Sequence, residues 1–574
     1  MDKDRLAELL EDIGTLLELK GENPFKVRAY HNAARAIGQY QGPLEKAVKE
    51  GALSDIPGIG KGLSERIEEF SGTGHIKYYD ELKSAIPPGM IEMLSIEGLG
   101  PRKIRAIHEK LGIDTVRELE EACRKNKIAS LDGFGNKTQE NILKGIQYLS
   151  SNQNKFLISD ALREALRILG LLKKKCKGNI KRIEIAGSLR RKKELIGDID
   201  FVASAPDPKK VMDVFASLEG VKDVIAKGST KTSVKLDGGI NADIRIVSDR
   251  EFPYALHHFT GSKEHNTAMR ALAKTKSMKM NEYGLFRKGR NVPCRNEKDI
   301  FDALGLSFIP PELREDRGEI EAASRGGIPR LVEEKDIKGV LHVHTSYSDG
   351  SASLEKMVAE TKKRGYSYVG ICDHSESAYY AGGLDESKLR KQWAEIDALN
   401  AEDRSFRIFK GIEVDIFPDG KIDYDERVLE KFDFVIASIH TKFKMTKEDM
   451  TERIIKAVKN PYTTMIGHLT GRLLLTREGY EVDIERIIEV CASEGKTIEL
   501  NSHPQRLDLD WRFCKLAKER GVPISVNPDA HNAEGLDDIT YGIGAARKGW
   551  LEKKDILNTR TAGELKKFFD KIKK

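Results

Sequence analysis

The most restrictive feature of the sequence is an alternation of short apolar strands and amphipathic helical segments over residues 337–574. Strand-like runs lie at Val340 to Val343, Tyr368 to Ile371, Phe434 to Ile439, Thr497 to Leu500 and Pro523 to Val526, with helix-length segments between them. Neighbouring parallel strands need such crossover segments. The alternation therefore predicts a parallel sheet, most economically a (β/α) barrel.

Histidines and carboxylates recur at the expected ends of these strands. His342 and His344 are two residues apart, so they face one side of a strand and can bind one metal ion. A single histidine of this kind is more simply a core or surface residue. Side chains at successive strand ends, however, reach the same barrel mouth. Nine such residues together indicate a metal site: His342, His344, Asp349, His374, Glu413, His440, His468, Asp529 and His531.

A second constellation, of three aspartates, lies in residues 150–310, where short β-branched runs and helical segments indicate an α/β or α+β unit. Asp198 and Asp200 share one strand face, and Asp243 lies in an apolar strand of its own. Because clustered carboxylates repel one another, a cation such as Mg²⁺ is expected among them, and two metal ions would activate a hydroxyl nucleophile and stabilise a departing pyrophosphate. Ser188 and Arg191 can donate hydrogen bonds to the oxygens of a triphosphate.

The first 150 residues repeat one pattern, hydrophobic-x-Gly-hydrophobic-Gly, at 56–60, 96–100 and 131–135. Such a turn leaves backbone N–H groups open to a phosphate at a helix N-terminus. One copy would be an ordinary interhelical turn, but three copies beside basic residues resemble the helix-hairpin-helix motif, which contacts DNA without reading its sequence. The expected DNA-binding residues are Gly58, Gly60, Lys61, Gly98, Gly100, Arg102 and Lys103.

Composition excludes several classes of protein. The net charge of +6 is too small to establish nucleic-acid binding by itself. Six dispersed cysteines without a C-x-x-C pair suggest neither a disulfide framework nor a cysteine zinc site. No run of about 18 apolar residues and no secretory signal is present, so we expect a cytoplasmic protein without a membrane partner. Nothing in the sequence demands more than a monomer.

A further motif resembles the thumb of family X DNA polymerases, the relatives of DNA polymerase beta. It runs Phe259-Thr-Gly-Ser-Lys-Glu-His-Asn-Thr-Ala-Met-Arg270 and continues with Asn281-Glu-Tyr-Gly284. The resemblance extends from about Asn23 to Pro310 and includes the nucleotidyltransferase aspartates. It implies that Asp198, Asp200 and Asp243 bind Mg²⁺ or Mn²⁺, with Asp243 activating the primer 3′-hydroxyl. It also implies nucleotide binding by Gly187, Ser188, Arg191, Gly197, Gly261, Asn266 and Arg270.

Two positions depart from that family. His258 stands where an aromatic residue, commonly Tyr, precedes Phe-Thr-Gly, so the sequence leaves discrimination against ribonucleotides open. Arg66 stands where relatives with deoxyribose-phosphate lyase activity carry a Schiff-base lysine. A guanidinium stays protonated and cannot act as that nucleophile, so no lyase reaction is expected through this residue.

The nine C-terminal residues resemble the ligand set of the PHP family, named for polymerase and histidinol phosphatase. The resemblance implies up to three Mn²⁺ or Zn²⁺ ions, and mixed imidazole and carboxylate ligation also suits Fe²⁺. Such a site hydrolyses phosphoesters. The implied groups are His342, His344, Glu413 and Asp529, then Glu413, His440 and His468, then Asp349, His374 and His531. Arg472 and Arg506 lie near the ligand loops in the sequence and are candidates to contact phosphate.

A length of 574 residues allows about four structural units. The expected fold is multidomain, α and α/β, with a distorted (β/α) barrel of PHP type at the C-terminus. The expected parts are an N-terminal helical DNA-binding domain at 1–85, a fingers-like helical domain at 86–150, a nucleotidyltransferase palm (α+β) at 151–250, a thumb at 251–312, a linker without predictable fold at 313–336 and the PHP domain at 337–574.

Together these features predict a DNA polymerase that fills short gaps in DNA repair and a metal-dependent 3′–5′ exonuclease in one chain. Its expected partners are gapped or nicked duplex DNA, primer 3′ ends and deoxynucleoside triphosphates. One alternative is a repair nuclease that cleaves abasic DNA or removes 3′-phosphates, with weak synthesis. Another is a small-molecule phosphoesterase tethered to DNA, against which the three hairpins argue.

Overall fold

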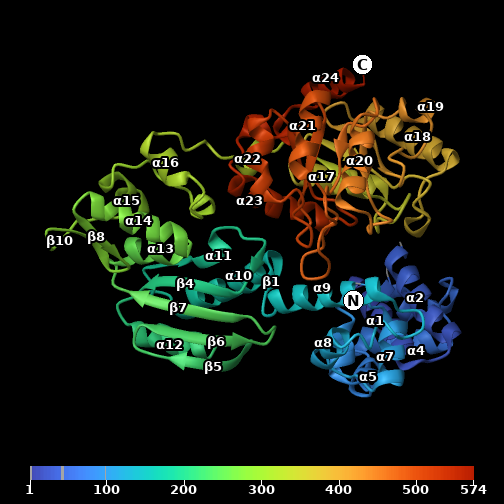
Figure 1. Cartoon of the computed structure of the whole chain (residues 1–574), viewed down its shortest axis with the longest axis horizontal. Coiled ribbons are helices and arrows are strands. Elements are labelled where there is room, and N and C mark those ends of the chain that lie inside the picture. The colour runs from blue at the N-terminus through green and yellow to red at the C-terminus, as the bar shows by residue number, and fades with distance from the viewer. Residues whose placement is uncertain (1–2, 41–43, 97, 574) are drawn as a thin grey trace. The chain divides into compact units, whose positions relative to one another are not determined.

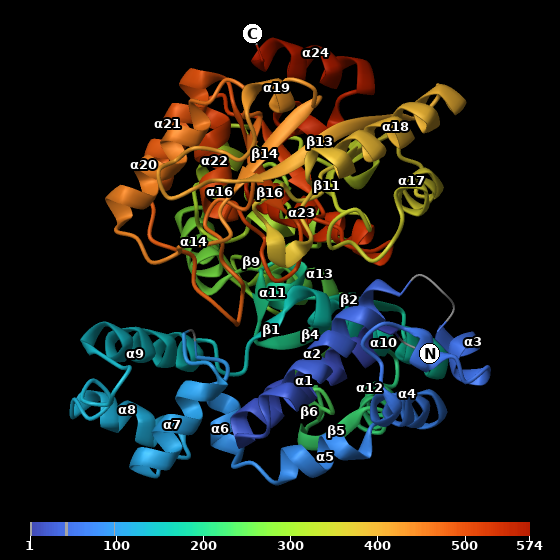
Figure 2. The ribbon, with the colours of Figure 1, turned by 90° about the vertical axis from the view of Figure 1, so that its right-hand side faces the viewer.

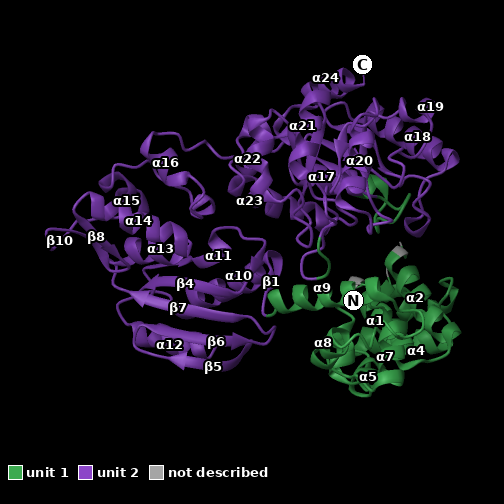
Figure 3. Ribbon diagram, in the orientation of Figure 1, with its two compact units in different colours: residues 1–153, 345–356, 476–478 green, residues 154–344, 357–475, 479–574 purple. Residues whose placement is uncertain are grey.

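The computed structural model describes residues 3–40, 44–96 and 98–573 (Figure 1). The chain divides into two compact units (Figure 3). One comprises residues 1–153 with the short segments 345–356 and 476–478, and the other comprises 154–344, 357–475 and 479–574. Among the described residues, none of the helices is both long enough and apolar enough to cross a membrane.

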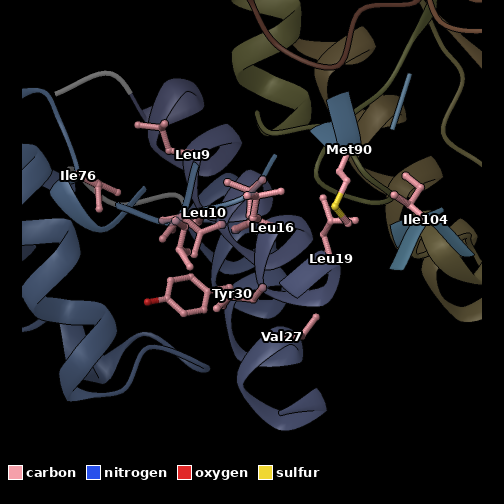
Figure 4. Packing of buried hydrophobic residues seen from close by; sticks show 14 of the residues in the cluster. Leu9, Leu10, Leu16, Leu19, Val27, Tyr30, Ile76, Met90 and Ile104 are labelled. Atoms are coloured by element: carbon pink, nitrogen blue, oxygen red, sulfur yellow. The ribbon is translucent and has the colours of Figure 1, made fainter. Parts of the chain in front are cut away.

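Residues 3–153 form a helical unit around one hydrophobic core. The apolar side chains of the first helix, among them Leu10 and Leu16, pack against Tyr30 of the second (Figure 4). The core runs from Leu6 to Ile146, so it crosses the boundary expected at residue 85. Its helices are α1 (Lys3–Lys20), α2 (Pro24–Gln39), α3 (Leu44–Lys49), α4 (Lys61–Thr73), α5 (Lys77–Ser84), α6 (Pro88–Met93), α7 (Pro101–Leu111), α8 (Val116–Arg124) and α9 (Asn136–Ser151), with a 3₁₀ turn η1 (Leu53–Asp55).

The palm is a five-stranded sheet in the order β2-β4-β7-β6-β5, in which β4 and β7 are parallel and the other neighbours antiparallel. Phe215 packs edge-on against Phe201, which attaches a helix to the sheet. The elements are β1 (Phe156–Leu157), α10 (Ile158–Lys175), β2 (Arg182–Ile185), α11 (Gly187–Arg190), β3 (Leu195–Ile196), β4 (Asp198–Ser204), α12 (Pro208–Ala216), β5 (Val221–Lys227), β6 (Lys231–Leu236) and β7 (Asn241–Val247).

The thumb combines three helices with a small antiparallel sheet in the order β10-β9-β8. Ser262 caps the second of these helices by accepting a hydrogen bond from the backbone N–H of His265. The elements are α13 (Phe252–Thr260), α14 (Lys263–Thr275), β8 (Met278–Asn281), β9 (Gly284–Arg287), β10 (Arg290–Asn291) and α15 (Glu297–Ala303).

The segment 313–336 joins the thumb to the barrel, but it is folded rather than the linker without predictable fold that we expected. Arg314 and Glu319 are fully buried, the first paired with Glu297 at 2.5 Å and the second with His265 at 2.6 Å. These two buried charges are neutralised by thumb residues. The segment contains η2 (Pro311–Leu313), α16 (Glu319–Ser324) and η3 (Glu334–Asp336).

The C-terminal domain is a parallel seven-stranded sheet whose strands follow chain order from β11 to β17. A parallel bridge from Val343 to Ala530 joins the end of β11 to the loop after β17, so the barrel is nearly closed. Two strands, β13 and β15, were not among the runs named from the sequence. The strands are β11 (Gly339–Val343), β12 (Tyr368–Ile371), β13 (Arg407–Asp415), β14 (Phe434–Ser438), β15 (Met465–Ile466), β16 (Thr497–Asn501) and β17 (Ile524–Asn527).

Helices surround these strands (Figure 2). In the last of them, the side chain of Phe569 stacks on that of Phe434 in β14 and covers one end of the barrel core. The helices are α17 (Leu354–Lys363), α18 (Glu386–Glu402), α19 (Glu426–Leu429), α20 (Lys447–Val458), α21 (Ile484–Glu494), α22 (Trp511–Glu519), α23 (Ile539–Lys548) and α24 (Ala562–Ile572), with short turns η4 (Tyr379–Ala381), η5 (Glu534–Asp538), η6 (Lys553–Asp555) and η7 (Leu557–Thr559).

Candidate functional sites

The three palm aspartates meet at one edge of the sheet. The parallel register of β4 and β7 places Asp200 directly beside Asp243, and Asp198 lies two residues earlier on the same strand face. One carboxylate oxygen from each residue lies within 4.8 Å of the others. The ammonium of Lys231 forms an ion pair with Asp243. The structure thus brings together the three residues that the sequence grouped.

The electrostatics of this group fit a divalent cation. Burial, followed by repulsion from Asp198 and Asp243, raises the pKa of Asp200 to about 7. Such a shift indicates that the nearby cations do not fully neutralise the negative charge of the three carboxylates. Hard oxygen donors on one sheet edge suit Mg²⁺ or Mn²⁺.

Gly187 makes room for this carboxylate group. It begins α11 with φ of +63°, and a Cβ atom there would lie 2.2 Å from Oδ2 of Asp200. Any other residue would therefore strain the backbone and displace the aspartate. The sequence predicted a nucleotide contact at Gly187, and that remains a prediction; the space it leaves for Asp200 is a structural requirement that only the fold reveals.

Arg191, predicted to hold the triphosphate, lies in a buried polar network. Its Nε donates to Glu315 at 2.9 Å and its Nη1 donates to the carbonyl of Thr260 at 2.8 Å. The neighbouring Arg190 makes a bidentate pair with Glu297, at 3.0 and 2.6 Å. Arg191 thus anchors the loop that follows α11, and its contact with a nucleotide stays a prediction. These acidic partners were not predicted from the sequence.

The predicted thumb contacts surround the turn after α13. The side-chain amide of Asn266 donates to the carbonyl groups of His258 and Gly261, at 2.7 and 3.2 Å. It therefore fixes the turn rather than lying on an open helix face. Arg270, one turn further along α14, is exposed. Among the remaining predicted nucleotide contacts, Ser188 is half-buried in α11, and Gly197 directly precedes β4.

The C-terminal histidines and carboxylates converge at the carboxyl ends of the barrel strands. Ligand atoms within 4.8 Å of one another form three groups. The groups differ in part from the expected ones, because His374 lies with Glu413 and His440, where His468 was expected. Nε2 of His468 is nevertheless only 3.0 Å from Glu413 Oε1. The three groups are His342, His344 and Asp529; His374, Glu413 and His440; and His344, Asp349, His374 and His531.

Two acidic residues that were not predicted from the sequence lie behind this cluster and orient its imidazoles. Glu499 accepts a hydrogen bond from Nδ1 of His342 at 2.6 Å, and Asp415 accepts one from Nδ1 of His440 at 2.6 Å. With Nδ1 carrying the proton, each Nε2 can present its lone pair to a metal ion. Two signals could have found them: a glutamate within the apolar run of β16, and the position of Asp415 two residues after Glu413 on one strand.

Two features of the cluster fit metal binding: a buried nitrogen atom without a hydrogen bond and an uncommon backbone conformation. Nε2 of His342 is buried without a hydrogen bond and faces oxygens of Glu413 and Asp529 at 3.4 Å each. His342 and Asp529 adopt φ of +63° and +53°. Such conformations are uncommon for non-glycine residues and concentrate at functional sites.

Without a metal, protonated imidazoles balance the carboxylates. Burial opposes the charged form of His440, but Glu413 and Asp415 raise its pKa to about 9. Burial would likewise favour protonation of Glu413, but the imidazolium groups of His440 and His342 hold its pKa well below its usual range. A metal ion would replace these protons.

The two arginines expected near phosphate have different surroundings. Nε of Arg506 lies 3.5 Å from Oδ2 of Asp529, at the edge of the cluster. Arg472 instead pairs with Asp510 at 2.5 Å and donates to backbone carbonyls of residues 506 and 507. It therefore supports the loop that carries Arg506 rather than facing the cluster.

The three glycine turns of the helical unit share one geometry. Gly58, Gly98 and Gly133 have φ between +78° and +91°, where glycine is favoured. Two residues later, the glycines at 60, 100 and 135 cap α4, α7 and α9 without a side-chain hydrogen bond. A Cβ atom at any of these three caps would meet nothing within 4 Å. The helix N-termini are therefore open to an anion.

The basic residues near these turns differ in their contacts. Lys61 begins α4 and is exposed, and Lys103 Nζ donates to the carbonyl of Gly98 at 3.0 Å. Arg102 is exposed, with Nε 2.8 Å from Glu18. Arg66 stacks on the ring of Tyr78. Glu97, in the second copy of the pattern, lies outside the described residues.

Four family models match the chain. A helix-hairpin-helix domain covers residues 1–76 and a SAM-like helix-hairpin-helix tandem covers 90–147. The DNA polymerase beta thumb covers 255–315, and the PHP domain covers 341–503. The matches follow the order of the structural parts along the chain.

Of three relatives, one matches nearly all of the chain and two match a part of it. The DNA polymerase/3′-5′ exonuclease PolX of Bacillus subtilis is 40% identical over 572 residues, 99% of both chains. Rat DNA polymerase lambda is 25% identical over 343 residues, 54% of this chain and 56% of that protein. A probable phosphatase of Thermoanaerobacter sp. is 29% identical over 251 residues, 42% of this chain and 97% of that protein.

Proposed function

The chain belongs to the family X DNA polymerases that carry a PHP domain, and from this we propose that it fills short gaps in DNA and trims DNA 3′ ends at two separate metal sites. It is a DNA polymerase and a 3′–5′ exonuclease. Abasic cleavage and 3′-phosphate removal are not favoured as the main activity, because the phosphatase relatives match only the C-terminal part.

The palm aspartates would hold Mg²⁺ or Mn²⁺ for nucleotidyl transfer. Asp198, Asp200 and Asp243 supply oxygens from one sheet edge. The bound ions would lower the pKa of the primer 3′-hydroxyl and neutralise the pyrophosphate that leaves. Asp243 lies opposite Asp200 and is the residue that would take up the hydroxyl proton.

Residues around α11 would hold the incoming deoxynucleoside triphosphate. Ser188 and the backbone at Gly187 and Gly197 lie next to the aspartate strand, and Arg191 fixes the loop between them. Gly261, Asn266 and Arg270 would lie against the nucleotide and the template pair. The hydrogen bonds of Asn266 to the turn suggest that it shapes this surface.

The PHP cluster would bind up to three ions of Mn²⁺ or Zn²⁺, held by the nine expected residues. Mixed imidazole and carboxylate donors suit either metal. The ions would supply an activated water and grip phosphate oxygens. Glu499 and Asp415 hold the imidazoles in the required tautomer, and Arg506 is placed to contact the phosphate.

The helical unit would hold duplex DNA through its backbone phosphates. The open helix N-termini after Gly58, Gly98 and Gly133 suit phosphate oxygens, with Lys61, Arg102 and Lys103 beside them. Such contacts position DNA without selecting a sequence, as gap filling requires. Binding should weaken steeply with salt because counterions are released.

One observation carries the proposal: two complete metal-compatible sets, one of carboxylates and one rich in histidine, occur in a single chain. The test uses a 5′-labelled primer beside a short gap, with Mn²⁺, in the presence and absence of deoxynucleoside triphosphates. We expect extension when the nucleotides are present and shortening when they are absent. Shortening under both conditions would overturn gap filling as the main role, and a primer of unchanged length would overturn both activities.

A further inference from the structure

Two exposed tyrosines stand at the rim of the histidine cluster. Tyr379 and Tyr380 begin the short turn η4, in the loop that follows His374. Tyr379 is 85% exposed and Tyr380 is 62% exposed. The ring centroid of Tyr380 lies 6.2 Å from that of His374 and 6.3 Å from that of His440. Aromatic surface is thus open to solvent beside two of the expected metal ligands.

The loop that presents these rings is anchored on both sides. The backbone N–H of Leu384 donates to the carbonyl of His374 at 2.9 Å, which closes the base of the loop. The backbone N–H of Ser377 donates to Asp423 at 2.8 Å, and Ala378 is fully buried. The backbone is therefore held in place while both tyrosine side chains stay largely exposed, as in a preformed binding surface.

The burial of the metal ligands limits how a DNA end can reach them. His344 is fully buried and His374 is only 5% exposed. A single-stranded end can bring its phosphate to a site lined by such buried ligands more readily than a duplex can, because a paired strand adds bulk around the phosphate. The base of the terminal nucleotide is then unstacked and unpaired, which is unfavourable unless the protein replaces the lost stacking.

We propose that Tyr379 and Tyr380 form a stacking platform for the base of the 3′-terminal nucleotide while its phosphodiester lies on the metal cluster. The inference rests on the proposed exonuclease function and adds a nucleobase subsite to it. Aromatic rings stack on any base, because every base has a π-face. The platform would therefore favour frayed or single-stranded 3′ ends without selecting a sequence.

The test compares two single-stranded oligonucleotides in Mn²⁺. One ends in an ordinary deoxynucleotide, and the other ends in a deoxyribose that lacks a base. Both place the same phosphodiester on the metals, but only the first has a base to stack. We expect the wild-type KM for the ordinary end to be about 5- to 100-fold lower, in line with the stacking energy of one base.

Variants separate stacking from other effects of the ring. Tyr380→Ala should raise KM for the ordinary end by that factor and leave the baseless end unchanged, and Tyr379→Ala should act in the same direction. Tyr380→Phe keeps a flat ring and should behave like wild type, whereas Tyr380→Leu keeps apolar area but loses the ring and should behave like alanine. Primer extension by each variant reports that the rest of the chain is folded.

Three outcomes would overturn the proposal. Equal losses on both substrates in Tyr380→Ala would show that the ring supports the metal ligands instead of a base. Unchanged KM values in both alanine variants would show that the rings contact no part of the substrate. A wild-type protein that degrades neither end would instead overturn the exonuclease assignment, and the platform with it.

Discussion

The ammonium of Lys548, at the end of α23 in the barrel, donates a hydrogen bond to the backbone carbonyl of Arg191 in the palm at 3.1 Å. Lys548 also pairs with Glu315 at 2.5 Å, and the same carboxylate oxygen accepts from the guanidinium of Arg191. Nearby, Glu194 accepts from the indole N–H of Trp511 at 3.1 Å. The barrel therefore holds the loop between α11 and the aspartate strand.

This contact predicts that a residue of the PHP domain affects nucleotide binding in the palm. Lys548→Met should raise the KM for deoxynucleoside triphosphates by about 3- to 10-fold, in line with the net contribution of one ordinary hydrogen bond to a positioning loop. The rate of 3′-end trimming should not change. Steady-state gap filling and trimming, measured on the same preparation, check both expectations.

Lys518→Met is the matched control, because Lys518 pairs with Glu552 at 2.7 Å within the barrel itself. It should leave the nucleotide KM unchanged. An unchanged KM in a folded Lys548→Met protein would show that the loop holds its position without the barrel.

The two sites should be separable by single substitutions. Asp200→Ala removes a ligand from the palm and should lower extension more than about 100-fold, beyond the typical effect of residues behind the ligands. It should spare trimming, whereas His344→Ala should abolish trimming and spare extension. Loss of both activities in either folded variant would contradict independent sites. Product length on a gapped, labelled primer is the readout for both.

Gly187→Ala should damage the polymerase site through one methyl group. The added Cβ would overlap Oδ2 of Asp200, and φ of +63° disfavours alanine. We expect extension to fall more than about 10-fold, as for misplaced metal ligands. Gly238→Ala, in the turn between β6 and β7, is the control, because a Cβ there meets nothing within 4 Å. Primer extension rates of the two variants should differ accordingly, and equal rates would contradict the steric argument.

If the hairpins bind DNA phosphates through their backbone N–H groups, Gly60→Ala should weaken DNA binding without unfolding the protein. Its φ of −90° accepts alanine, and the space beside it is open. A methyl group in front of the amide should nevertheless hinder a phosphate, so DNA affinity should fall about 3- to 10-fold. Gly72→Ala, inside α4 and equally open, should have no such effect. Fluorescence anisotropy with gapped DNA measures the difference, and equal affinities would argue against contact at this turn.

The PHP cluster should show linked proton and metal binding. The folded pKa of His440 is about 9, above its ordinary value of 6.5. Its contribution to the stability of the metal-free protein is therefore fully present below pH 6.5 and is lost as pH rises through 9. Mn²⁺ must displace that proton, so Mn²⁺ affinity should rise with pH up to about 9.

Titration calorimetry in buffers of different ionisation enthalpy should detect proton release on Mn²⁺ binding at pH 7.5. The His440→Asn variant should release fewer protons, and thermal melts of chelator-treated protein should show lower stability at pH 9 than at pH 6.5. Metal uptake without proton release would contradict this arrangement of imidazolium and carboxylate.

Features that depend on short spacing between residues can be predicted from the amino-acid sequence alone. Aspartates two residues apart must share a strand face, and strand and helix alternation requires a parallel sheet. These rules predict that Asp198 and Asp200 lie on one strand face, as do His342 and His344. Short patterns likewise predict the glycine turns and the barrel. They act within a few residues, so they need no knowledge of the whole fold.

The partners of residues distant in sequence, by contrast, depend on how the whole chain packs. The pairing of Asp200 with Asp243 depends on strand register, and the position of Glu499 behind His342 depends on barrel closure. Glu315, in a segment predicted to be a linker, becomes a largely buried partner of two cations because the burial of charges requires compensation. Such compensation is set by long-range packing, which local periodicity does not encode.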